Sequence, residues 1–236
     1  MMAPVAILAG GLATRLRPVT LNTPKSMLIV AGKPFIYHQL ALLKSRGVED
    51  VVLCLGNHGK LVEEYVSDGS AWGLNVKYSY DGATLLGTGG ALMKALPLLP
   101  DEFFVLYGDS YLDIEMRPVL ERFRSEGKPL LMTVYRNRGE ADVSNILFKD
   151  GRIIRYDKKD PPADMEYIDY GLSVMKKSAF DGWPDDAPSD LADLYVKLVE
   201  KGEAAGFEVS MRFYEIGSFQ GIKETEKYIK SMMGQN

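Results

Sequence analysis

Residues 5–18 read VAILAGGLATRLRP: four apolar residues precede Ala9, a glycine pair and then two arginines. The apolar run predicts a buried strand. The glycines after it let backbone N–H groups face an anion, because no Cβ obstructs a close approach. Arg15 can then grip phosphate oxygens with its planar guanidinium, and Lys25, on the turn Thr23-Pro24, supplies a second cation. The segment therefore predicts an anion-binding turn.

The charge distribution supports this interpretation. No Asp or Glu precedes Glu49, whereas six cations do: Arg15, Arg17, Lys25, Lys33, Lys44 and Arg46. A basic stretch around a glycine-rich turn, in a chain of net charge −4, suits a polyanion. The alternative is a tight turn with solvated arginines.

Outward from this segment, apolar runs alternate with helical patterns. Strands are predicted at 51–55, 76–80 and 103–107, and helices at 34–46, 61–66 and 89–99. Strands that are largely apolar and spaced by helices are typical of a parallel sheet covered on both faces. Ligands bind beyond the carboxyl ends of such strands. The loops after Leu8, Leu55, Tyr80 and Tyr107 are therefore the expected place for chemistry.

The pattern changes after residue 130, where strands dominate. They are predicted at 130–135, 145–149, 152–156, 167–175 and 207–214, with helices at 191–201 and 221–232. This favours an antiparallel or mixed extension over the mouth of the sheet. We expect one domain, 1–236, with 1–129 binding the nucleotide and 130–236 binding the acceptor.

Composition and charge exclude several other classes of protein. The chain has 236 residues, 46% of them hydrophobic, and a net charge that argues against a nucleic-acid-binding surface. Its single cysteine, Cys54, lies in an apolar run and excludes an internal disulfide, which suits a reducing cytosol. No apolar run reaches the length of a membrane span. We therefore expect a cytoplasmic protein without nucleic-acid or membrane partners.

The first turn also resembles a family signature. Residues 8–20 followed by Pro24-Lys25 resemble the motif L-A-G-G-x-G-T-R-L-x-P-x-T…P-K of the sugar-1-phosphate nucleotidyltransferases, with Ala13 where the family usually has glycine. The resemblance runs over essentially the whole chain. It implies an α/β fold with a Rossmann-like, mostly parallel sheet flanked by helices and a mixed or antiparallel sugar-binding extension.

For the nucleotide half, the resemblance implies catalytic roles for Arg15, Lys25 and Asp109. The run 86–91 (LGTGGA) resembles the second glycine-rich turn of the family, which borders the base and ribose, and Gly108-Asp109 resembles its metal-binding strand end. The residues expected at the nucleotide are Leu8, Ala9, Gly10, Gly11, Thr14, Gly87, Thr88, Gly89 and Gly108. The alternative for Asp109 is an ordinary turn residue.

For the acceptor half, the resemblance implies sugar-phosphate contacts from Lys159, Asp169 and Gly171. Here the chain departs from the family: Lys158 stands where glutamate is usual, Asp160 for proline, and Asp169 for asparagine. A solvated charge run is the alternative for the two lysines. Mg²⁺ is the expected cofactor, with Asp109 and Glu215 as its ligands, and Glu215 replaces the aspartate usual at the second position.

The function implied is transfer of a nucleoside monophosphate from a nucleoside triphosphate to a sugar 1-phosphate, giving an NDP-sugar and pyrophosphate. Guanylyl transfer to heptose- or mannose-1-phosphate is favoured. Uridylyl transfer to an N-acetyl-sugar 1-phosphate and cytidylyl transfer to phosphocholine remain alternatives. A non-catalytic regulatory protein that binds nucleotide-sugars is an alternative of another class. An NAD-dependent oxidoreductase is disfavoured because the first turn lacks G-x-G-x-x-G. A homo-oligomer is possible.

Overall fold

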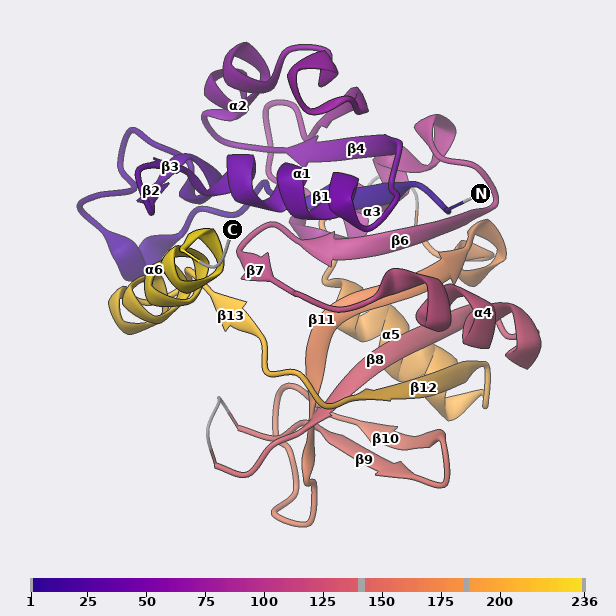
Figure 1. Ribbon diagram of the computed structural model, residues 1–236. Coiled ribbons are helices and arrows are strands. Elements are labelled where there is room, and N and C mark those ends of the chain that lie inside the picture. Colours follow the sequence, from indigo (N-terminus) through magenta and orange to yellow (C-terminus); the bar gives the residue numbers. More distant parts are fainter. Residues whose placement is uncertain (1, 140–142, 185–186, 235–236) are drawn as a thin grey trace.

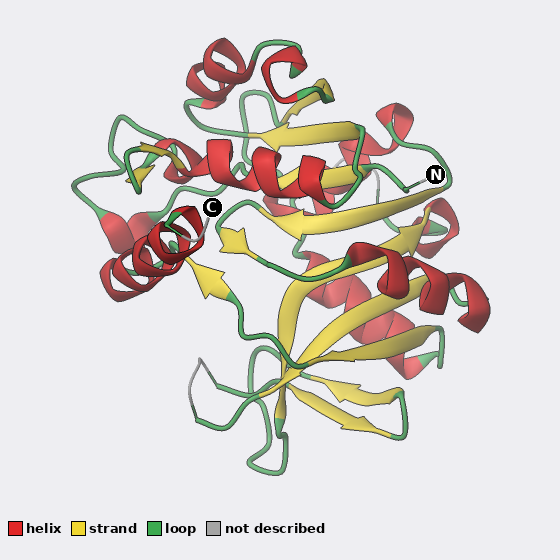
Figure 2. Cartoon of the chain, in the orientation of Figure 1, coloured by secondary structure: helices red, strands yellow, loops and turns green. Residues whose placement is uncertain are grey.

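The structure is a computed structural model that describes residues 2–139, 143–184 and 187–234 (Figures 1 and 2). Its α-helices are α1 (Phe35–Ser45), α2 (Gly59–Val66), α3 (Gly87–Ala95), α4 (Met116–Glu126), α5 (Leu191–Glu200) and α6 (Phe219–Met233). The strands of its main sheet are β1 (Val5–Leu8), β4 (Asp50–Leu55), β5 (Asn75–Tyr80), β6 (Glu102–Tyr107), β8 (Leu130–Arg136), β9 (Ile146–Lys149), β10 (Arg152–Tyr156), β11 (Tyr167–Lys176) and β12 (Ala204–Val209). Two further pairs are β2 (Ile29–Val30) with β3 (Lys33–Pro34), and β7 (Ser110–Tyr111) with β13 (Tyr214–Glu215).

Four parallel strands form the centre of the main sheet, in the order β6-β1-β4-β5. Leu8, the last residue of β1, pairs with Cys54 on one side and with Tyr107 on the other. These strands therefore end level, and the loops that follow them share one edge of the sheet. The predicted α/β class with a mostly parallel central sheet is confirmed.

The second half of the chain continues the same sheet beyond β6. Strand β11 runs antiparallel to β6, β8 and β9, whereas β12 runs parallel to β8. The mixed extension predicted from the sequence is therefore present.

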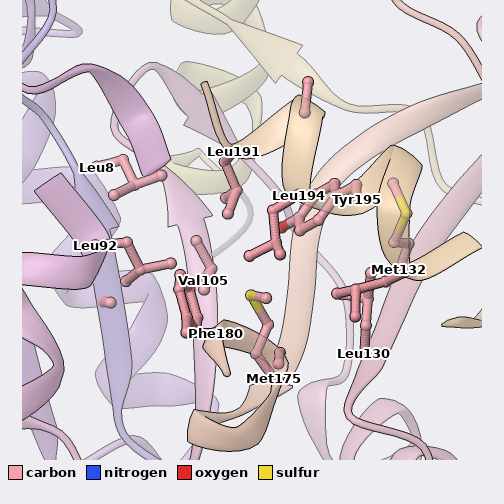
Figure 3. Close-up of a cluster of buried hydrophobic side chains, with 14 of the residues drawn as sticks. Leu8, Leu92, Val105, Leu130, Met132, Met175, Phe180, Leu191, Leu194 and Tyr195 are labelled. Atoms are coloured by element: carbon pink, nitrogen blue, oxygen red, sulfur yellow. The ribbon is translucent and has the colours of Figure 1, made fainter. Parts of the chain in front are cut away.

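Side chains on the two faces of the sheet pack against two different layers of helices. Val5 and Ile7 of β1 belong to a core cluster with side chains of α1, α2 and α4. Ala6 and Leu8 point the other way, into a cluster with side chains of α3 and α5. Figure 3 shows Leu8, Leu92 and Leu191 of this second cluster together. Both faces of β1 are thus covered, which explains why this strand is apolar throughout.

The structure differs from the sequence prediction at several elements. The last long strand is β12, Ala204–Val209, and not residues 207–214; its start is the weakly strand-favouring Ala204-Ala205-Gly206, held by its pairing with β8. Helix α4 was not predicted, although Pro118 in its first turn is compatible with a helix start. The short pairs β2–β3 and β7–β13 were missed because each of these strands has only two residues.

Among the described residues, no helix combines the length and the apolar character needed to span a membrane.

Candidate functional site

Two cavities open at the carboxyl ends of the central strands. The larger, of about 710 Å³, lies between the central sheet and the extension; the smaller, of about 240 Å³, lies between the first turn and the start of α3. Tyr107 and Asp109 line both. The loops predicted to carry chemistry after Leu8, Tyr80 and Tyr107 therefore meet in one place.

Asp109 stands where the two cavities meet and is held from several sides. Gly108 N donates to Leu8 O over 2.9 Å, and Ile216 N donates to Asp109 O over 2.9 Å. Lys25 Nζ donates to Asp109 Oδ2 over 2.8 Å. The predicted lysine and aspartate, remote in the sequence, are thus brought into one ion pair.

A buried glutamine on α1 holds the loop that carries Asp109. Gln39 is 1% exposed, and its Nε2 donates to Ser110 O over 2.8 Å and to Tyr107 O over 3.2 Å. It therefore fixes the chain on both sides of Asp109. Sequence reasoning missed this residue, because a glutamine within an apolar helix face does not reveal which groups it bonds.

The first turn has the tight geometry that its sequence suggests. Ala13 has φ 48° and ψ 43°, a left-handed conformation that favours glycine, the residue usual in the family at this position. Thr20 Oγ1 donates to Ala13 O over 2.8 Å and anchors the turn. Arg15 is exposed and lines the larger cavity.

Most residues predicted at the nucleotide lie around the smaller cavity. Those that line it are Leu8, Ala9, Gly10, Gly11, Gly87, Thr88 and Gly108. Thr14 and Gly89, though described, line neither cavity, and Gly89 N donates instead to Ser189 O over 2.8 Å.

The second glycine-rich turn is tied to the start of α5. Thr88 Oγ1 donates to Asp190 Oδ1 over 2.9 Å and accepts from Leu191 N over 2.8 Å. At Gly87, φ is 70° and a Cβ would lie 2.5 Å from Ser189 O, so only glycine fits. The extension thus supports the turn that borders the smaller cavity.

Asp81 is a further residue of this cavity that the sequence analysis did not identify. It directly follows β5, is 8% exposed, and accepts a hydrogen bond from Leu86 N over 3.2 Å. Burial raises the pKa of its carboxyl above the ordinary value. Its position after a strand of the parallel sheet was the available signal.

Asp169 lies in the wall of the larger cavity, together with Tyr156 and Asn145. Its Oδ1 accepts from Gly171 N over 3.0 Å, and its own N donates to Asn145 Oδ1 over 2.9 Å. Burial raises the pKa of Asp169 to about 6, against the lowering effects of the Gly171 N–H, Lys158 and the Tyr156 hydroxyl. Gly171 itself has φ 95°, and a Cβ at this position would lie 3.3 Å from Ser110 Oγ and 3.4 Å from Tyr107 Cδ2.

The two lysines of the acceptor motif line the larger cavity but differ in their surroundings. Lys159 is 81% exposed at its side chain, and its Nζ donates to Asp193 Oδ1 on α5 over 2.7 Å. Lys158 Nζ lies 3.7 Å from Asp190 Oδ2 and acts electrostatically on Asp169. Lys159, the predicted sugar-phosphate contact, is therefore paired with the carboxylate of Asp193, whereas Lys158 is close enough to Asp169 to act on its charge.

Asp109 and Glu215 both line the larger cavity, but their carboxylates differ in hydrogen bonding and exposure. Glu215 Oε1 accepts from Ser218 Oγ over 2.8 Å, and its Oε2 accepts from Gly217 N, so this carboxylate is turned toward its own loop. Asp109 remains 34% exposed at its side chain. Within the described chain, no cluster of three or more acidic, histidine or cysteine side chains could hold a metal ion. Two carboxylates beside an open cavity fit Mg²⁺, which usually takes few protein ligands and completes its shell with substrate phosphates and water.

The site thus combines the carboxyl edge of a parallel sheet, a glycine-rich turn, a lysine–aspartate pair and two adjoining cavities in an α/β protein. The sequence model of the nucleotidyl transferase family matches residues 5–230. The chain belongs to this family.

Individual relatives agree with that assignment. The chain is 44% identical over 110 residues to N-acetylmuramate alpha-1-phosphate uridylyltransferase of Neisseria meningitidis serogroup B, covering 46% of this chain and 48% of the relative. It is 36% identical over 110 residues to D-glycero-alpha-D-manno-heptose 1-phosphate guanylyltransferase of Campylobacter jejuni, covering 47% and 49%. Each match thus spans about half of the relative. The crystal structure of HddC from Yersinia pseudotuberculosis shares the fold, with TM-score 0.80, 23% identity and coverage of 97% and 100%.

Proposed function

We propose that this protein transfers a nucleoside monophosphate from a nucleoside triphosphate to a sugar 1-phosphate and releases pyrophosphate. The observation that carries the proposal is the Lys25–Asp109 pair at the junction of the two cavities. A nucleotide in the smaller cavity would direct its phosphates toward this pair, and an acceptor in the larger cavity would meet them there. Residues 1–236 would then act as one unit, with 1–129 binding the nucleotide and 130–236 the acceptor.

The reaction follows from this arrangement as an in-line displacement. An oxygen of the acceptor phosphate forms a bond to the α-phosphorus, and the bond from that phosphorus to the β-phosphate bridging oxygen breaks. Pyrophosphate leaves with the electron pair. Because the nucleophile is already an anion, the site needs no base and acts by positioning and charge neutralisation.

Each charged residue then has a role. Arg15 binds the pyrophosphate end, Lys25 neutralises the α-phosphate, and Lys159 orients the incoming sugar phosphate, with Lys158 near the sugar. Lys159 must leave Asp193 to do so. Gly10 and Gly11 let the backbone approach the phosphates.

Magnesium is the proposed cofactor. Asp109 would ligate it directly, and Glu215 directly or through water, because its carboxylate is already bonded to Ser218 and Gly217. When bound, the cation offsets negative charge on the phosphate oxygens.

Relatives that match about half of the chain differ in base and sugar, so similarity does not identify the substrates. Guanylyl transfer to a heptose- or mannose-1-phosphate is our primary proposal. Asp169 favours a hydroxyl-rich acceptor, because a carboxylate only accepts hydrogen bonds from its ligand. We propose a cytoplasmic enzyme, in agreement with a buried free thiol at Cys54.

The test is a substrate matrix. ATP, GTP, CTP, UTP and dTTP are each combined with mannose-, heptose-, glucose- and N-acetylhexosamine-1-phosphate and with phosphocholine, in Mg²⁺, and pyrophosphate release is measured. Release with at least one pair, lost in Asp109→Asn, supports the proposal. Absence of release with every pair, together with binding of an NDP-sugar, would instead indicate the non-catalytic regulatory protein.

A further inference from the structure

Glu215 is held by the start of helix α6, the element that follows its strand β13 in the chain (Figure 1). The main-chain oxygen of Glu215 accepts a hydrogen bond over 2.8 Å from Oγ1 of Thr225, which is 0% exposed. Its Oε1 accepts from Ser218 Oγ over 2.8 Å, and the same serine oxygen accepts from Gly221 N over 2.9 Å. The backbone and the carboxylate of Glu215 are therefore both bonded to this short segment.

Gly221 faces the Glu215 carboxylate so closely that no side chain fits between them. A Cβ built on Gly221 would lie 1.9 Å from Glu215 Oε1, 2.6 Å from its Cδ and 2.7 Å from its main-chain oxygen. All three distances are far shorter than van der Waals contact. Gly221 lies inside α6 and does not have a positive φ, so its backbone conformation does not require glycine. Glycine is unfavourable inside a helix, and here its role is to leave room for the carboxylate.

The same contacts bring the Glu215 carboxylate beside the Lys25–Asp109 pair. Ile216 N donates to Asp109 O over 2.9 Å, which joins the two loops. A Cβ built on Gly217 would lie 2.5 Å from Glu215 Oε2 and 3.6 Å from Lys25 Nζ, so Gly217 adjoins both charged groups. A displacement of the Glu215 carboxylate would therefore change its position relative to the proposed cation.

The length of the side chain at position 215 decides whether the close contact with Gly221 exists. Glutamate is one methylene longer than aspartate, the residue usual in the family at this position. An aspartate carboxylate would end about 1.5 Å closer to its own backbone, the length of one carbon–carbon bond, and would leave the space beside Gly221 empty. Glutamate at 215 and glycine at 221 are therefore complementary in shape.

We propose that Gly221 is a positioning residue for the second carboxylate of the metal site, and that its missing side chain is what lets a glutamate serve at position 215. The inference rests on the metal role given to Glu215 in the proposed function, and it adds the residue that decides which carboxylate this position accepts. An alanine at 221 would displace the carboxylate, because the glutamate side chain is the flexible partner in the contact.

Mn²⁺ binding tests the inference without turnover. The full chain is titrated with Mn²⁺, alone and with GTP, and the free ion is followed by electron paramagnetic resonance. Gly221→Ala should weaken Mn²⁺ binding by about 10- to 100-fold, the loss typical when a group that orients a metal ligand is removed. Glu215→Asp should also weaken it, although aspartate is usual in the family, because the shorter side chain ends elsewhere. In the Glu215→Asp background, Gly221→Ala should cause a much smaller further loss, because the contacts with Oε1 and Cδ no longer exist.

A second glycine of α6 supplies the matched control. A Cβ at Gly234, the residue after the last turn, would lie 3.6 Å from Lys230 O, which is an ordinary contact. Gly234→Ala should therefore leave the Mn²⁺ affinity unchanged. Melting curves in EDTA test the packing by themselves: Gly221→Ala should lower the melting temperature of the natural chain by more than it lowers that of Glu215→Asp, because residues in contact are energetically coupled.

The outcomes separate this inference from the proposed function. Equal Mn²⁺ affinities for Gly221→Ala and the natural chain overturn the inference, and so does an equal loss in both backgrounds. Where Gly221→Ala does not fold, Glu215→Asp decides, and an affinity equal to that of the natural chain overturns the inference. Unchanged Mn²⁺ binding in Glu215→Gln overturns the ligand role of Glu215 and the inference with it. The expected binding pattern without pyrophosphate release from any substrate pair supports the inference and overturns only the transfer reaction.

Discussion

Lys25 Nζ and Asp109 Oδ2 are 2.8 Å apart, although the residues lie 84 positions apart in the chain. The lysine side chain is 18% exposed and the aspartate 34%, so the pair is only partly screened by solvent. In an apo site this contact keeps two opposite charges at the junction of the cavities. With substrates bound, the same two groups would be shared between phosphate oxygens and a cation.

Asp109→Asn should therefore slow pyrophosphate release by about 10²- to 10³-fold, the loss typical of one charge-stabilising group. Stability should change little, because the residue is partly exposed and Asn retains its shape. Steady-state kinetics with the best substrate pair and a melting curve check this. The exposed Asp101→Asn should keep normal turnover, and near-normal turnover of Asp109→Asn would remove Asp109 from the mechanism.

Gln39 provides a test of how the Asp109 loop is held. Gln39→Met keeps the volume but leaves Ser110 O and Tyr107 O without their side-chain donor, which should cost about 1–3 kcal/mol of unfolding free energy. We also expect the variant to need more Mg²⁺ for half-maximal activity, because Asp109 is no longer fixed on both sides.

The control for Gln39→Met is Leu43→Ala, a buried residue on the same helix. It should lower stability by about 2–5 kcal/mol through a cavity, with no change in the Mg²⁺ requirement below its melting temperature. Equal Mg²⁺ requirements for Gln39→Met and the natural chain would show that Gln39 only stabilises the fold.

The parallel core and the location of the site were predictable from the sequence, because strand burial and glycine placement are local signals. Ala13 was recognised as a departure from its family, yet its left-handed φ of 48° became known only from the structure. Gln39 and Asp81 were not predicted as site residues. The sequence does not show which groups a polar residue in an apolar helix, or just after a strand, will contact in the fold. Helix α4 was missed although Met116, Val119, Leu120 and Phe123 carry the helical spacing.

The ion pair between Lys159 and Asp193 competes with the proposed role of Lys159. Asp193→Asn frees the lysine and should lower KM for the sugar 1-phosphate severalfold, whereas Lys159→Ala should raise it, with little change in KM for the nucleotide. Both side chains are largely exposed, at 81% and 46%, so neither change should alter the melting temperature noticeably.

The matched control for this pair is Glu126→Gln, which removes the partly exposed ion pair with Arg122 on α4. It should leave both KM values unchanged. An acceptor KM that does not respond to either Lys159→Ala or Asp193→Asn would assign the sugar-phosphate contact to another cation, with Lys158 the next to replace.

Asp169 gives the chain a pH dependence of defined sign. Its carboxyl has an ordinary pKa of 3.8 and a pKa of about 6 in the folded protein, because burial disfavours the charged form. Between these values the folded state holds a proton that the unfolded state has released, so unfolding free energy falls as pH rises from about 4 to about 6 and stays lower above. Asp169→Asn carries no such proton and can still accept from Gly171 N. The variant should therefore be more stable than the natural chain above pH 6, by a margin that shrinks toward pH 4. Denaturant unfolding of both proteins across this range measures the margin, and one that does not vary with pH would mean that Asp169 ionises as readily in the fold as in the unfolded chain.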